Sequence, residues 1–107
     1  MKWRIRTTME FNRIYLGGQR LLGYFYLLYF QNNNLGYPRL GVVASRKNLK
    51  KAVIRNRSKR IVKEQFRLQK HRLPSIDIVF IAKSQLKEAR KQELHKCVNE
   101  LFNQLIM

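Results

Sequence analysis

The cationic side chains between residues 46 and 72 are the part of this sequence with the clearest chemical potential. This segment is a quarter of the 107-residue chain, yet it holds 12 of the 23 Lys and Arg residues and only one acid, Glu64. Lys and Arg neutralise phosphate groups and release their counterions, which favours binding of a polyanion. The segment therefore predicts contact with nucleic acid, with an anionic membrane surface or an acidic protein as the competing partners.

A helix over about residues 52–71 would position these side chains. At about 100° per residue, one broad arc of this helix is apolar and would face a core. The arc comprises Ile54, Ile61, Val62, Phe66 and Leu68. The opposite side is a cationic ridge of Asn56, Lys59, Arg60, Lys63, Arg67 and Lys70. Like charges three or four residues apart destabilise a helix by a few tenths of a kcal/mol per pair, and this uncompensated cost indicates a polyanionic partner.

A short helix is predicted after residue 7. Thr7 and Glu10 fit a capping box, in which each side chain accepts a hydrogen bond from the backbone N–H of the other residue. Phe11 and Tyr15 follow one helical turn apart, and two glycines at positions 17 and 18 end the helix.

Tyr29 is a third aromatic residue that could join Phe11 and Tyr15. It belongs to a strand predicted over residues 20–31. If the short helix lies beside this strand, Phe11, Tyr15 and Tyr29 would line an open groove. Aromatic side chains in a basic groove hold single-stranded nucleic acid, at about 1–3 kcal/mol per stacked base. Aromatic residues at helical spacing also commonly belong to a hydrophobic core, so the core interpretation is open at this point.

The other reactive residue types are scattered along the chain. The six acids lie at positions 10, 64, 77, 88, 93 and 100, without a spacing that suggests a catalytic pair. His71 and His95 have no neighbour at metal-ligand spacing. Cys97 is the only cysteine, which excludes an internal disulfide and a cysteine-based zinc cluster. We therefore expect no catalytic residue and no metal site in the polypeptide itself.

The remaining elements predict an α+β fold. A strand at residues 40–44 is expected to form a hairpin with the strand at 20–31, and the nearly continuous apolar run at 76–82 is typical of a buried central strand. A last helix over about residues 85–105 has a core face of Leu94, Val98, Leu101 and Leu105. We expect one domain, residues 1–107, built as a sandwich of a sheet and helices.

The composition narrows the class of protein further. The net charge is +17, and hydrophobic residues make up 45% of the chain, which is too many for a disordered basic tail. No apolar run approaches the roughly 18 residues that a membrane span needs, and the N-terminus lacks the apolar region of a secretory signal. A single cysteine is compatible with a reducing compartment, so we expect a cytoplasmic protein without a membrane partner.

Residues 55–60 read Arg-Asn-Arg-Ser-Lys-Arg, which closely resembles the signature of the protein subunit of bacterial ribonuclease P, Arg-Asn-Arg followed by x-Lys-Arg. Further stretches resemble this family in order and at compatible spacing. They are residues 10–15, 28–29, 39–43, 66–68 and 77–83. The similarity covers about residues 3–105, which is essentially the whole chain.

The resemblance implies an accessory role in an RNA enzyme. Proteins of this family bind a large catalytic RNA, which with Mg²⁺ removes the 5′ leader from precursor tRNA. The protein contacts both the RNA and the leader as a subunit of this endoribonuclease, while the RNA supplies the active-site groups. The implied partners are therefore ribonuclease P RNA and precursor tRNA, with Mg²⁺ for the holoenzyme, no organic cofactor and no obligate protein partner.

The resemblance also implies roles for individual residues. The residues that would contact the catalytic RNA are Arg55, Asn56, Arg57, Lys59, Arg60, Lys63 and Arg67. The aromatic cleft for the single-stranded leader would be formed by Phe11, Tyr15 and Tyr29. Phosphate contacts beside this cleft would come from Arg46, Lys47 and Lys83.

The fold implied by the resemblance is a ribosomal protein S5 domain 2-like sandwich with a small mixed sheet. Its β-α-β crossover through the basic helix is left-handed, although general statistics favour a right-handed crossover. One departure from the family pattern is Ser58, where an aliphatic residue is common.

Two other classes of function are compatible with the residues alone: a structural RNA-binding protein such as a ribosomal component, and a basic module that binds proteins or a membrane surface.

Overall fold

The computed structural model describes residues 3–106. The helices and strands in chain order are α1 (Thr8–Gly17), β1 (Gln19–Leu22), β2 (Tyr26–Asn32), β3 (Arg39–Val43), α2 (Ala52–Gln69), β4 (Ile76–Ala82) and α3 (Lys91–Ile106). Two short 3₁₀ helices, η1 (Lys70–Arg72) and η2 (Ser84–Glu88), flank β4.

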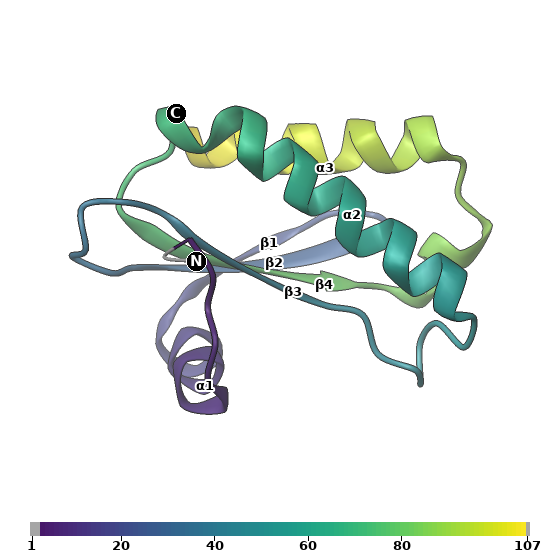
Figure 1. Cartoon of the computed structure of the whole chain (residues 1–107), viewed down its shortest axis with the longest axis horizontal. Coiled ribbons are helices and arrows are strands. Elements are labelled where there is room, and N and C mark those ends of the chain that lie inside the picture. Colours follow the sequence, from purple (N-terminus) through teal and green to yellow (C-terminus); the bar gives the residue numbers. More distant parts are fainter. Residues whose placement is uncertain (1–2, 107) are drawn as a thin grey trace.

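The strands form one mixed sheet in the order β1-β2-β4-β3. β3 and β4 are parallel, and the other neighbouring pairs are antiparallel. α2 and α3 cover one face of the sheet, and α1 lies against the opposite face, which we call the open face (Figure 1). The expected α+β sandwich with a small mixed sheet is confirmed.

The chain passes from β3 through α2 to the parallel strand β4. In Figure 1, α2 lies above these strands and β1 and β2 recede behind them, so β4 lies behind β3. Because both strands run from left to right in this view, the path turns in the left-handed sense. The left-handed crossover implied by the resemblance is confirmed, whereas the general preference for right-handed connections predicts the wrong hand here.

β4 is a central strand whose two faces belong to different cores. Ile78 and Phe80 pack with α2 and α3 in a core of 18 buried residues. Val79 points the other way and packs with Ile14 of α1 and with Ile5 in a cluster of three buried residues. Far fewer buried side chains therefore hold α1 to the sheet than hold α2 and α3.

The aromatic stretch at residues 20–31 folds as two strands rather than the predicted one. β1 and β2 pair around a tight turn, in which the Gly23 N–H donates to the Tyr26 carbonyl at 2.9 Å. A Cβ at Gly23 would lie 2.8 Å from that carbonyl oxygen, so the turn requires glycine. The single-strand prediction is wrong because the aromatic residues around Gly23 conceal the turn.

The predicted hairpin between this stretch and residues 40–44 is also wrong. β4 lies between β2 and β3, and six of its seven residues are buried. A strand that is apolar on both faces is best buried between two neighbours. The last strand in the sequence therefore takes a central position, and β3 becomes an edge strand.

α2 matches the predicted basic helix, with a difference on its apolar arc. Val62 and Phe66 are buried as predicted, but Leu68 is 50% exposed. Ser58 is fully buried: its Oγ donates to the Arg55 carbonyl at 2.7 Å, and its own carbonyl accepts from the Tyr26 hydroxyl at 3.0 Å. A hydroxyl at this core position is thus satisfied locally.

The last helix is shorter than predicted. η2 occupies Ser84–Glu88, and α3 begins at Lys91. The predicted core face is confirmed at Leu94, Val98 and Leu101, which are buried against the sheet and α2.

Candidate nucleic-acid interface

The outer side of α2 carries a continuous cationic surface. Arg60, Lys63 and Arg67 are exposed, and Lys59 is partly exposed. One shallow recess on this surface is lined by Asn56, Lys59, Arg60, Lys63, Glu64 and Arg67. None of these cations forms an ion pair with a carboxylate among residues 3–106. The structure therefore gathers five of the seven predicted RNA-contacting residues on one uncompensated surface, which we call the α2 ridge (Asn56, Lys59, Arg60, Lys63 and Arg67).

Arg55 and Arg57 lie beside the ridge and are partly buried. The Arg55 guanidinium donates to the carbonyls of Leu49 and Lys50, both at 2.8 Å. The Arg57 guanidinium donates to the Ala89 carbonyl at 3.3 Å, and its Nε is buried without a protein partner. Arg55 therefore fixes the segment that leads into α2, and Arg57 ties α2 to the segment that leads into α3.

The three predicted aromatic residues meet on the open face. The rings of Phe11 and Tyr15 are 6.3 Å apart, and those of Tyr15 and Tyr29 are 5.2 Å apart in an edge-on arrangement. All three side chains are partly buried, and burial together with the nearby Tyr29 raises the pKa of Tyr15. A Cβ at Gly41 would lie 2.6 Å from the Phe11 ring, so the glycine lets α1 approach the sheet closely.

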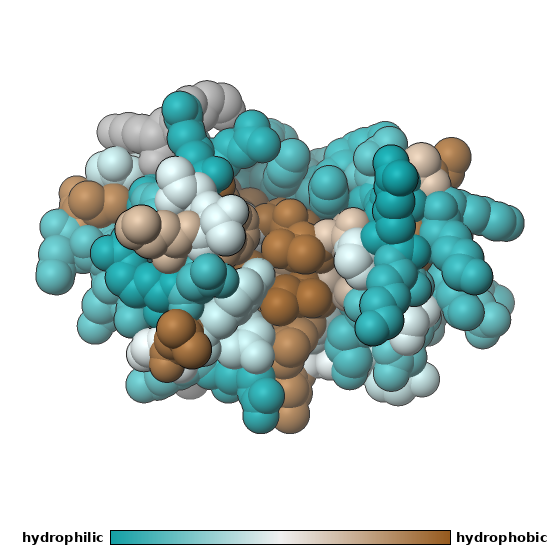
Figure 2. All heavy atoms as spheres, turned by 90° about the horizontal axis from the view of Figure 1, so that it is seen from below, coloured by the Kyte–Doolittle hydropathy of each residue, from teal (hydrophilic) through white to brown (hydrophobic). Residues whose placement is uncertain are grey.

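An apolar strip continues the open face beyond α1. Leu27, Ile81 and Val43 are partly buried and adjacent in register across β2, β4 and β3. Figure 2 shows a brown apolar strip that crosses the middle of this face between hydrophilic side chains on either side. The aromatic cluster and this strip together form an extended surface that is apolar at its floor and polar at its margins.

The predicted phosphate-binding residues lie at the carboxyl ends of β3 and β4. Arg46 and Lys47 follow β3 and are exposed. Lys83 follows β4, is partly buried, and donates through Nζ to the Gly23 carbonyl at 3.3 Å. Lys83 therefore also fixes the turn between β1 and β2.

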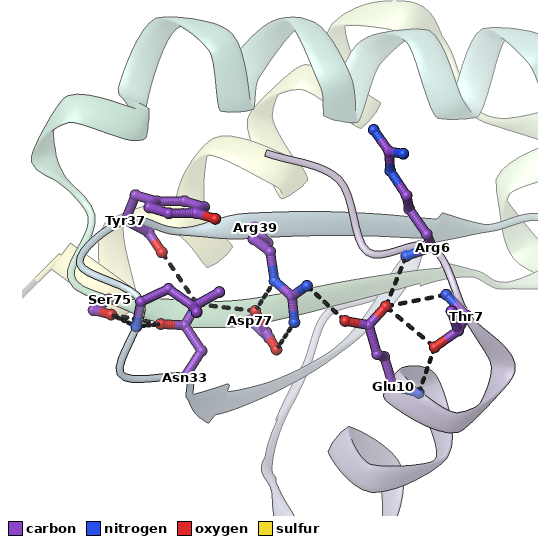
Figure 3. A network of polar contacts seen from close by, with 9 residues as sticks. Arg6, Thr7, Glu10, Asn33, Tyr37, Arg39, Ser75 and Asp77 are labelled. Atoms are coloured by element: carbon purple, nitrogen blue, oxygen red, sulfur yellow. Dashed lines mark hydrogen bonds and ion pairs between the residues drawn. The ribbon is translucent and has the colours of Figure 1, made fainter. Parts of the chain in front are cut away.

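A polar network that the sequence analysis missed holds α1 against the sheet (Figure 3). Arg39 donates to both carboxylate oxygens of Asp77, at 2.8 and 2.7 Å, and to Glu10 Oε2 at 2.6 Å. The Glu10 carboxylate also accepts the Thr7 N–H at 3.1 Å, which completes the predicted capping box. Asn33 extends the network through a 2.9 Å bond to Asp77.

The hydrogen bonds of this network shift the pKa values of Glu10 and Arg39. The exposed fraction of the side chain is 13% for Arg39 and 5% for Asp77. The hydrogen bond from Arg39, with smaller contributions from the backbone N–H groups of Thr7 and Arg6, outweighs the opposing effect of burial and lowers the pKa of Glu10 from its ordinary 4.5 to about 2. The bonds to Asp77 and Glu10 raise the pKa of Arg39. One signal could have revealed the pair, namely an acid at position 77 within an otherwise apolar strand.

Neither a metal site nor a membrane span is present in the described part of the chain. Within residues 3–106, no group of three or more His, Cys, Asp and Glu residues could hold a metal ion. The Mg²⁺ that the resemblance implies for a holoenzyme thus has no ligand set of that kind here. No helix in the same range is long and apolar enough to cross a bilayer.

Comparisons with known proteins place the chain in a family. A sequence model described as "Ribonuclease P" matches residues 1–106. The curated "Ribonuclease P protein component" of Coxiella burnetii is 55% identical over 103 residues, which cover 96% of this chain and 85% of that protein. The chain belongs to the ribonuclease P protein family. Family membership implies a role in tRNA processing as the protein component of ribonuclease P, in association with ribonuclease P RNA.

Solved structures of ribonuclease P proteins share the fold. The protein from Staphylococcus aureus has a TM-score of 0.89 at 29% identity, over 94% of this chain and 93% of that one. The protein from Thermotoga maritima, in complex with 1-(4-fluorophenyl)-2-thiourea, has a TM-score of 0.82 at 33% identity, over 96% of this chain and 97% of that one. The architecture described above is therefore the architecture of the family.

Proposed function

We propose that this chain binds ribonuclease P RNA through the α2 ridge and the single-stranded 5′ leader of precursor tRNA through the open face. The observation that carries the proposal is the placement of two chemically different surfaces on opposite sides of one sheet. One surface is cationic and presented by a firmly packed helix. The other combines partly exposed aromatic rings with an apolar strip.

The α2 ridge suits a folded RNA. Its cations repeat along the helix, and none is neutralised by a carboxylate of the described chain. Phosphates would supply the missing counter-charge, and the release of their counterions would drive binding and make it depend on salt. Arg55 and Arg57 would contribute near the start of α2, while they also bond to the segments that lead into α2 and α3.

The open face suits an extended single strand. Bases would stack on Phe11, Tyr15 and Tyr29, whose rings are clustered but not fully buried. The apolar strip would continue this floor toward the ends of β3 and β4. Arg46 and Lys47 would bind the phosphates there, and Lys83 would contribute if its bond to the Gly23 carbonyl is exchanged.

The chemical step is assigned to the RNA in this proposal. Among the described residues, no group of three or more His, Cys, Asp and Glu side chains could hold a metal ion. The chain would therefore act by increasing the affinity for precursor tRNA, and Mg²⁺ would be bound by the RNA and its substrate.

Reconstitution tests the proposal directly. Purified protein is mixed with a bacterial ribonuclease P RNA and precursor tRNA at low Mg²⁺, and leader removal is measured with and without protein. We expect cleavage that depends on the RNA and is strongly stimulated by the protein. Tight RNA binding without stimulation would instead favour a structural RNA-binding protein, and cleavage by the protein alone would contradict the assignment of the chemistry to the RNA.

A further inference from the structure

Residues 3–6, which precede α1, lie opposite α2 and line one side of a pocket. The backbone of this segment pairs with the edge strand β3: the Leu40 N–H donates to the Trp3 carbonyl at 2.7 Å, and the Ile5 N–H donates to the Leu40 carbonyl at 3.0 Å. This pairing extends the sheet by a short parallel bridge at Arg4. The segment is thus held in place beside α2, although neither the α2 ridge nor the aromatic cluster includes it.

A pocket of about 390 Å³ lies between this segment and α2. Its floor is apolar and is formed by Trp3, Leu40 and Phe66. The indole of Trp3 is fixed on two sides, because Lys70 Nζ lies 4.4 Å from its ring centroid and the Tyr37 ring meets it edge-on at 5.3 Å. The volume lies within the range of about 300–1,000 Å³ that small-molecule sites occupy.

The polar residues that line the pocket within the described range are all cationic. Arg4 and Arg6 contribute from the N-terminal segment, and Lys63, Arg67 and Lys70 contribute from α2 and its end. A second groove begins at the same four residues, Arg4, Arg6, Leu40 and Lys63, and runs over β3 to Phe11. An apolar floor under converging cations matches the two halves of a nucleotide, since a base needs apolar and aromatic contact and a phosphate needs positive charge.

We propose that this pocket binds one unpaired nucleotide of the RNA partner, with the base against Trp3 and the flanking phosphate on the cationic rim. The inference rests on the proposed RNA-binding function and adds to it a site with Trp3, Arg4 and Arg6 as new contacts. The pocket shares Lys63 and Arg67 with the α2 ridge. RNA that lies along the ridge can therefore place one base in the pocket without leaving the ridge.

Tryptophan fluorescence monitors this pocket directly, because Trp3 is the only tryptophan in the sequence. Ribonuclease P RNA is titrated into the protein while Trp3 fluorescence and RNA binding are followed together. We expect the fluorescence to be quenched in parallel with binding. Inorganic polyphosphate, which has the charge but no bases, should bind and leave the fluorescence nearly unchanged, and AMP should quench only at concentrations far above those of the RNA.

Variants at Trp3 give an independent measurement. We expect Trp3→Ala to weaken binding of ribonuclease P RNA about tenfold, which is the order of one stacked base, and Trp3→Phe to recover most of that loss. Lys87→Ala, which removes an exposed cation outside the pocket, controls for the general effect of charge. Thermal melts confirm that each variant is folded.

The outcomes separate this inference from the proposed function. Normal affinity of Trp3→Ala for the RNA, or unchanged Trp3 fluorescence when the unmodified protein binds the RNA, would overturn the pocket and leave the proposed function intact. Equal quenching by polyphosphate and RNA would also overturn it, because charge alone would then explain the signal. Absence of RNA binding by the unmodified protein would remove the proposed function and the inference together.

Discussion

The two faces of the sheet are built by different means. Among residues 3–106, 18 buried residues form an apolar core on the face covered by α2 and α3. On the open face, three buried residues and the ion pairs of Arg39 hold α1. A large core makes α2 a rigid support for closely spaced like charges. A small cluster leaves aromatic rings partly exposed, which is a requirement for stacking with a ligand rather than with the core.

The core under α2 and α3 should give the largest loss of stability when it is disrupted. Phe102 is fully buried, and its ring lies 5.1 Å from that of Phe80 and 6.4 Å from that of Phe66. We expect Phe102→Ala to lower the free energy of unfolding by about 3–5 kcal/mol, because it leaves a cavity among aromatic rings. Urea denaturation measures this. A loss below about 1 kcal/mol would contradict the contrast between the two faces.

Substitution of Arg39 tests how much its ion pairs with Glu10 and Asp77 stabilise the fold. Arg39→Met leaves the Asp77 carboxylate buried without its partner, and we expect a loss of about 3 kcal/mol in the free energy of unfolding. The matched control is the double variant Arg39→Met/Asp77→Leu, which removes both charges and should recover much of that loss. If the double variant is as unstable as the single one, the unpaired charge is not the cause.

Removal of a cation from the α2 ridge should lower the affinity for RNA and leave the free energy of unfolding unchanged. Arg60 is exposed on the ridge without an ion pair in the described chain. We expect Arg60→Ala to weaken assembly with ribonuclease P RNA and to reduce the slope of log affinity against log salt by about 1, with unfolding unchanged. Lys87→Ala is the control. An unchanged slope would place Arg60 outside the RNA contact.

The smallest effect is expected in the dependence of stability on pH. The pKa of Glu10 is lowered from 4.5 to about 2 in the folded chain, so the unfolded chain binds more protons between these values. Stability should therefore fall as the pH falls from about 5 toward 2. Urea denaturation across this range should show a smaller decline for Glu10→Gln than for the unmodified chain, and equal declines would contradict the role of Glu10.

Local signals in the sequence predicted much of this architecture. The capping box of α1, the start of α2 at about residue 52 and the span of β4 were predicted correctly, because each depends on residues that are close together in the sequence. The family resemblance supplied the left-handed crossover, which local physics alone would have assigned to the other hand.

The features that the sequence did not predict depend on distant residues. The position of β4 between β2 and β3, the pairing of Arg39 with Asp77 and the pocket at Trp3 all join segments that are more than 30 residues apart. The turn at Gly23 was missed for a different reason, since its aromatic neighbours lack the polar residues that mark most turns. Among the predicted site residues, the dependence on distant residues also concealed the internal bonds of Arg57 to Ala89 and of Lys83 to Gly23.

We propose that the open face binds a single-stranded leader while the α2 ridge binds the catalytic RNA. The most direct test measures the affinity of the reconstituted holoenzyme for precursor tRNA and for mature tRNA, with Tyr15→Ala in place of the unmodified protein and Tyr15→Phe as the control. We expect Tyr15→Ala to weaken binding of precursor tRNA at least about fivefold, while binding of mature tRNA and assembly with the RNA are unchanged. Equal weakening of both substrates, or no weakening of either, would contradict it.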